Sequence, residues 1–66
     1  MMFNPPTGET DFMIDYDSMT AHLWSQNQTD MTTMLMMQMP NLVAGGFTVV
    51  RYIQDERPEI FGDEEE

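Results

Sequence analysis

The sequence predicts a small α+β domain: a short antiparallel sheet of about three strands with one helix packed on one face, in the order strand–strand–helix–strand. Two neighbouring segments alternate apolar and polar residues, which is typical of a hairpin. A methionine-rich segment with helical spacing follows them, and a run of β-branched and aromatic residues comes last. With 66 residues, the chain is expected to form one domain.

Alternation from residue 11 onward predicts the first strand, because Phe12, Ile14 and Tyr16 fall on one face of an extended chain. Asp17 and Ser18 then supply residues that favour a turn. The second strand is predicted at about residues 20–26, close enough to the first to pair with it as a hairpin.

The helix is predicted from an N-cap at Thr29 or Asp30 to about Met39, because either residue can accept a hydrogen bond from the first turn. Pro40 is expected to stop or kink it, and a last turn around residues 41–43 stays open as an alternative. Two interpretations of its methionines stay open: they form a pliable core beneath the helix, or they form an adaptable contact surface. Met36 or Met37 is the candidate for an exposed methionine. The stripe at helical spacing consists of Met31, Met34, Leu35 and Met39, and Met36 and Met37 widen it.

A flexible joint at Gly45-Gly46 precedes the last strand, which is predicted at residues 47–53. Residues 1–10 are expected to be a flexible N-terminal lead, because Pro5-Pro6 excludes a helix there. The single domain then covers residues 11–61, and residues 62–66 form a predicted disordered acidic tail.

Charge is the strongest compositional signal. Twelve acidic residues stand against Arg51 and Arg57, there is no lysine, and the formal net charge is −10. Direct binding of nucleic acid is therefore not expected, because it needs cationic contacts to phosphate, and an anionic membrane repels the chain in the same way. A basic protein surface is the favoured partner, although the charge could also serve only to keep a small protein soluble.

No arrangement of residues in the sequence indicates catalysis. His22 is the lone histidine and no cysteine is present, so neither a nucleophile motif nor a transition-metal cluster is expected. Asp15-x-Asp17 lacks the glycine and distal glutamate of a calcium loop. We therefore expect no enzyme activity, no metal and no cofactor. Without a signal-like leader or a long apolar run, the protein is expected to be soluble and not exported.

Arg51 is the most distinctive candidate for a partner contact, because it lies in the middle of a predicted strand and arginine makes forked bonds to carboxylates. An internal ion pair with Asp15 or Asp17 is the alternative. Acidic residues of the first strand and two strand aromatics, which could be core or contact, complete the predicted partner-binding set: Arg51, Asp11, Asp15, Asp17, Trp24 and Tyr52.

The segment Gly46-Phe47-Thr48-Val49-Val50-Arg51 resembles the beginning of the last strand in a viral family, the small inhibitors of host RNA polymerase made by short-tailed lytic phages. Members of that family have a similar length, the same strand–strand–helix–strand order and a Gly-Phe-x-Val-x-Arg pattern. The distance along the chain from Phe12 to Phe47 is also similar. The resemblance covers roughly the central two thirds of the chain.

The resemblance implies a non-catalytic inhibitor of host RNA polymerase in the host cytoplasm, a monomer or weak homo-oligomer that occupies a basic nucleic-acid channel or the jaw surface. The family carries two arginines in its last strand that contact the jaw; Arg51 matches the first, and Ile53 stands at the place of the second. Two other functions stay open: a DNA-mimic inhibitor of a host restriction or CRISPR nuclease, and a small virion or assembly subunit.

Overall fold

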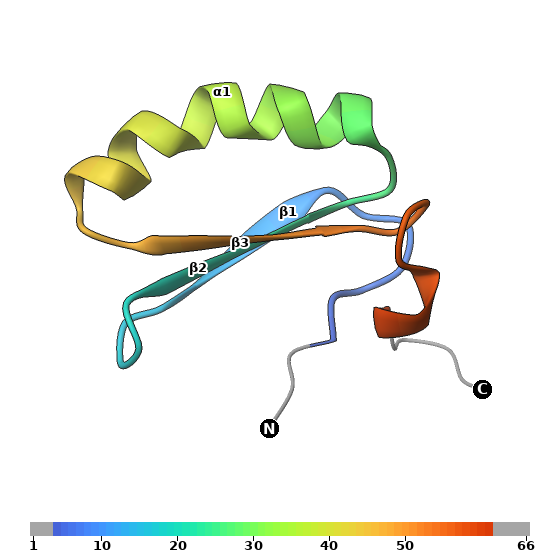
Figure 1. Ribbon diagram of the computed structural model, residues 1–66, viewed down its shortest axis with the longest axis horizontal. Helices are drawn as coiled ribbons and strands as arrows, with labels where there is room; N and C mark the ends of the chain where they lie inside the picture. Colours follow the sequence, from blue (N-terminus) through green and yellow to red (C-terminus); the bar gives the residue numbers. More distant parts are fainter. Residues whose placement is uncertain (1–3, 62–66) are drawn as a thin grey trace.

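A three-stranded sheet and one helix form two layers in the computed structural model, which describes residues 4–61 (Figure 1). This confirms the predicted α+β fold and the order strand–strand–helix–strand. The elements are β1 (Asp11–Asp15), β2 (Thr20–Ser25), α1 (Gln28–Ala44), β3 (Thr48–Ile53) and a short 3-10 helix, η1 (Pro58–Ile60).

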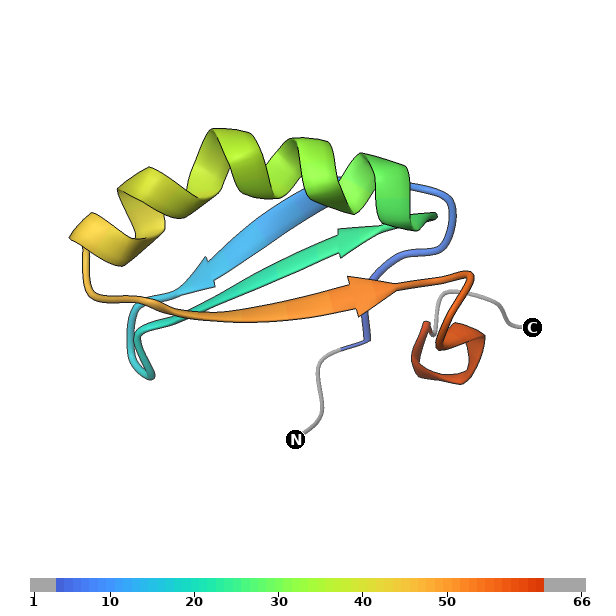
Figure 2. The same cartoon turned by 45° about the horizontal axis from the view of Figure 1, so that its top comes forward.

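The sheet is mixed, with the strand order β1-β2-β3. β1 and β2 pair antiparallel as predicted, but β2 and β3 pair parallel, so the prediction of an antiparallel sheet was wrong for the last strand. The cause is α1, which returns the chain along the sheet, so that β3 starts beside the start of β2 (Figure 2). The backbone N–H of Thr48 accordingly donates to the carbonyl of Met19, just before β2, at 2.9 Å.

α1 begins earlier than predicted. Its N-cap is Asn27, whose side-chain oxygen accepts a hydrogen bond from the backbone N–H of Asp30 at 2.8 Å, so neither Thr29 nor Asp30 is the cap. Asn27 also receives a hydrogen bond at its carbonyl from the hydroxyl of Ser25, which is fully buried at the end of β2. The chain therefore passes from strand to helix through two short hydrogen bonds around Asn27.

α1 also continues through Pro40 to Ala44, so Pro40 does not stop it at about Met39, and the alternative of a further turn around residues 41–43 is the one observed. Proline removes one helical hydrogen bond at a cost of about 3 kcal/mol. Leu42, two residues after Pro40, is buried in the core. Burial of a leucine stabilises the fold by roughly 1.5–3 kcal/mol, which offsets much of the cost of the proline. The last turns of α1 slope toward the sheet in Figure 1, which brings Leu42 to the core.

The main core lies between α1 and the sheet. α1 packs on β2 and β3. The side chains of β2 that face the helix are fully buried, whereas those of the two outer strands are only partly covered. The buried cluster consists of Ala21, Leu23, Met31, Met34 and Leu42, with Ile14, Leu35, Phe47, Val49 and Ile53 packed around it.

The other face of the sheet is covered at one end only. Residues 4–8 and η1 lie on that side, away from α1 (Figure 1). The Asn4 side chain donates to the carbonyl of Ile60 at 2.9 Å, and the N–H of Gly8 donates to the side-chain oxygen of Gln54 at 3.0 Å. The flexibility predicted for residues 1–10 stays a prediction, and the predicted acidic tail lies outside the described residues. No helix in the described part of the chain is long and apolar enough to span a membrane.

Candidate functional site

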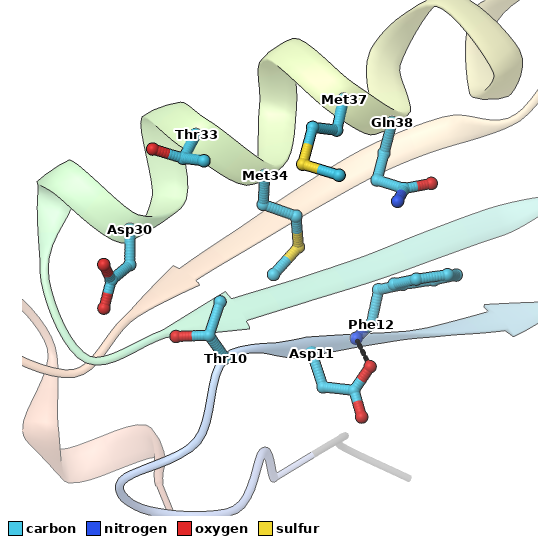
Figure 3. Close-up of a pocket in the computed structure, with 8 residues that line it drawn as sticks. All are labelled: Thr10, Asp11, Phe12, Asp30, Thr33, Met34, Met37 and Gln38. Carbon is cyan, nitrogen blue, oxygen red and sulfur yellow. Dashed lines mark hydrogen bonds between the residues drawn. The ribbon is translucent and has the colours of Figure 1, made fainter.

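A groove of roughly 400 Å³ runs between β1 and α1 (Figure 3). It exists because α1 lies over β2 and β3 and leaves β1 less covered. Phe12 of β1 is 39% exposed, although its partner across the strand pair, Leu23, is fully buried on the same face of the sheet. The groove is lined by Thr10, Asp11, Phe12, Asp30, Thr33, Met34, Met37 and Gln38.

The walls of the groove combine apolar and acidic chemistry. The sulfur-containing side chains of Met34 and Met37 extend from α1 toward β1, where the ring of Phe12 lies (Figure 3). Asp30, in the first turn of α1, lies at one end of the groove. At the start of β1, the carboxylate of Asp11 accepts a hydrogen bond from the N–H of Phe12 at 2.8 Å. The groove can therefore hold an apolar group with a cation beside it.

The methionines of α1 divide between core and surface. Met31 and Met34 are buried beneath the helix, as the core interpretation predicts. Met36 and Met37 are 77% and 67% exposed, so both of the residues singled out as candidates for exposure lie at the surface. Only Met37 of these two lines the groove.

The acidic residues of the first hairpin have different surroundings. Asp15 stabilises the turn: its carboxylate accepts hydrogen bonds from the backbone N–H groups of Asp17 and Ser18, at 3.0 and 3.4 Å. Hydrogen bonding from Ser18 and Asp17 lowers the pKa of Asp15 below its usual value. Asp17 is exposed in the turn itself, and Asp11 is exposed at the other end of β1.

Arg51 lies far from these carboxylates in the fold. It belongs to β3, at the opposite edge of the sheet from β1, so the structure does not bring it together with the predicted acidic residues. Within residues 4–61, Arg51 forms no salt bridge; the ion pair there joins Arg57 to Glu59 at 2.6 Å. The alternative interpretation, an internal pair with Asp15 or Asp17, is therefore wrong. Arg51 is exposed and adjoins the side chains of Leu35 and Met39 from α1.

The two predicted aromatic residues lie on the sheet face away from α1. Trp24 is 6% exposed, which leaves little of it for a partner, and its role as a contact stays a prediction. Tyr52 is half-buried, and its hydroxyl lies 2.7 Å from Nδ1 of His22 on the neighbouring strand, a hydrogen-bond distance. Burial raises the pKa of Tyr52.

Sequence reasoning missed the groove itself. Its signal was present in part: the apolar face of β1 carries Phe12, and Met34 and Met37 are three residues apart on α1. Only the sideways position of α1 over the sheet makes these side chains neighbours. In the described part of the chain, no three His, Asp or Glu side chains are placed to share a metal ion.

The fold and the groove define a small α+β protein with an acidic, partly apolar surface site. Comparison of the chain with protein families, curated proteins and solved structures finds no match.

Proposed function

We propose that this chain is a non-catalytic acidic binding protein that occupies a basic surface of host RNA polymerase in the host cytoplasm, and so inhibits transcription. The observation that carries the binding role is the uneven distribution of charge. Five acidic side chains lie along β1, at its ends and at the start of α1, and no described arginine lies among them: Glu9, Asp11, Asp15, Asp17 and Asp30.

The β3 side of the molecule has a different charge balance. Both arginines adjoin one hollow there, next to Glu56, and Arg57 is already paired with Glu59. A basic channel would therefore attract the β1 side first, because complementary charge speeds encounter and orients the two proteins. Arg51 then remains available for a forked bond to a carboxylate of the partner. RNA polymerase as the partner rests on the resemblance of residues 46–51 to the phage inhibitors.

The test is capture of polymerase from a bacterial host lysate on the immobilised chain, together with transcription in vitro. We expect polymerase subunits to be retained, transcription to fall and both effects to weaken as salt is raised. Arg51→Ala should weaken capture, whereas Arg57→Ala is the matched control, because that arginine already has a partner. Failure to retain any polymerase subunit, with transcription unchanged, contradicts the proposal. Retention of a nuclease in its place favours the DNA-mimic alternative.

A second pair of variants tests the steering role of the β1 side. Asp11→Asn with Asp17→Asn, and Asp55→Asn with Glu56→Gln, change the net charge by the same amount on the two sides of the molecule. We expect the first pair to slow association with polymerase more than the second, measured by surface binding kinetics at low salt. Equal slowing by both pairs would mean that only net charge matters.

A further inference from the structure

We infer that the groove between β1 and α1 receives an apolar side chain of a partner protein segment that carries lysine or arginine next to that side chain. This inference rests on the proposed function only in taking the partner to be a basic protein. Phe12 and Met37 offer apolar surface to solvent on both sides of one groove, and Met34 lies between them. Protein pockets that hold ligands have volumes of about 300–1,000 Å³, and this groove falls in that range.

Charge identifies the chemistry of the occupant. Asp11 and Asp30 line the groove, and neither described arginine does. The carboxylate of Asp11 points to the side of β1 away from α1 (Figure 3), so Asp30 supplies the charge. The carboxylate of Asp30 accepts no hydrogen bond from any residue in the range 4–61, whereas that of Asp11 is held by Phe12. Asp30 is therefore available to a cation from outside. An anion or a nucleic-acid phosphate would meet the carboxylate of Asp30, and a second copy of this chain would bring a further net charge of −10.

The methionines explain how such a groove can accept a side chain that it does not fit in advance. Methionine is unbranched and its thioether is polarizable, so Met37 can repack around leucine, methionine or phenylalanine. Surfaces built in this way bind amphipathic segments in which apolar anchors alternate with basic residues. The combination of an exposed phenylalanine, two methionines and a free carboxylate thus fits a basic amphipathic peptide.

The probe is a short synthetic peptide of leucine and lysine with its leucines on one helical face, labelled with a dye for fluorescence anisotropy. Two control peptides replace either every leucine by serine or every lysine by glutamate. We expect the leucine–lysine peptide to bind at least about tenfold more tightly than either control, because each control lacks one of the two interactions. NMR shift changes should centre on Phe12, Met34 and Met37.

Two matched pairs of variants of the full chain locate the site. Met37→Gln and Met36→Gln alter adjacent, exposed methionines, of which only Met37 lines the groove. We expect Met37→Gln to weaken the peptide about three- to tenfold and Met36→Gln to leave it unchanged. Asp30→Asn and Asp55→Asn remove one exposed carboxylate each, and only the first should weaken binding, by up to about fivefold at low salt. Circular dichroism verifies that each variant is folded.

Absence of peptide binding overturns the inference, and so does each of three other outcomes. Equal losses of peptide affinity in Met36→Gln and Met37→Gln place the contact elsewhere on the helix. Binding of the serine–lysine peptide that is as tight as that of the leucine–lysine peptide means that charge attraction alone holds the peptide. Dimers that form through the groove and exclude the peptide would make a second copy the occupant. The assay contains no polymerase, so groove-dependent binding with failed polymerase capture refutes only the proposed partner. Polymerase capture without peptide binding refutes only the groove.

Discussion

Gly46 joins α1 to β3 with a backbone φ of +82°, in the region where L-residues are strained. A Cβ added there would meet no atom within 4 Å, so substitution has no steric cost and its effect is conformational alone. An L-residue in this region costs about 1–2 kcal/mol. Replacing glycine also restricts the unfolded chain, which returns about 0.4–1 kcal/mol. We therefore expect Gly46→Ala to lower the free energy of unfolding by about 0–1.6 kcal/mol, with a central value of about 0.8 kcal/mol.

Chemical synthesis allows an alanine of the opposite hand, D-alanine, to be placed at the same position. A D-alanine at position 46 prefers positive φ, so the backbone strain of the L-alanine variant is absent, and the D-alanine variant should have a higher free energy of unfolding than the L-alanine variant. Trp24, the single tryptophan, is buried and reports urea unfolding by its fluorescence. A change of 1 kcal/mol moves the midpoint by up to about 1 M urea or 4–8 °C.

The pair of outcomes makes the test decisive. An L-alanine variant that is more stable than both wild type and the D-alanine variant would refute the positive φ at Gly46. Gly45→Ala serves as a contrast, because Gly45 has an ordinary negative φ but an added Cβ would lie 3.0 Å from the ring of Phe47. L-alanine at position 45 should therefore lower stability through crowding with that ring, not through backbone strain.

Three further predictions concern stability. Asn27→Ala removes the N-cap bond to Asp30 and should lower the free energy of unfolding by about 1 kcal/mol in urea titration, whereas Asn27→Ser should restore most of it. The pKa of Tyr52 is raised by burial. Its contribution to the free energy of unfolding is therefore complete below its ordinary pKa of about 10 and is lost as the pH rises through the pKa of the folded protein. Tyr52→Phe should reduce the loss of thermal stability that wild type shows above about pH 10. The pKa of Asp15 is lowered, so its contribution to the free energy of unfolding is complete above its ordinary pKa and is lost as the pH falls through the pKa of the folded protein. Asp15→Asn should therefore be less stable than wild type at neutral pH and lose less on acidification; equal acid profiles would contradict the turn hydrogen bonds.

Local patterns were enough to predict the strands and their facing. The alternation around Phe12 and around Leu23 identified the hairpin, because period two follows directly from extended geometry. Two errors had a common cause. The direction of β3 and the continuation of α1 past Pro40 both depend on packing against the sheet, where the burial of Leu42 offsets a proline that is unfavourable locally.

The candidate site depended still more on tertiary structure. Asp11 was predicted as an acidic contact and does line the groove, but Phe12, Asp30 and Met37 join it only because α1 lies over β2 and β3. No spacing in the sequence specifies that lateral offset. Arg51 was recognised from its position in a strand, and its separation from the acidic residues followed only once β1 and β3 were known to occupy opposite edges.

The position of β3 has a consequence for how the protein behaves at high concentration. Within residues 4–61, β3 pairs on one side only, and this edge is a six-residue β-branched and aromatic segment with Arg51 as its single charge. Such edges are templates for strand-to-strand aggregation, and natural proteins usually guard them with local charge. Here the edge strand is protected against such aggregation by the repulsion between whole molecules of net charge −10. Acid or concentrated salt removes that repulsion, so the colloidal stability of this protein is set by solvent conditions rather than by the edge itself.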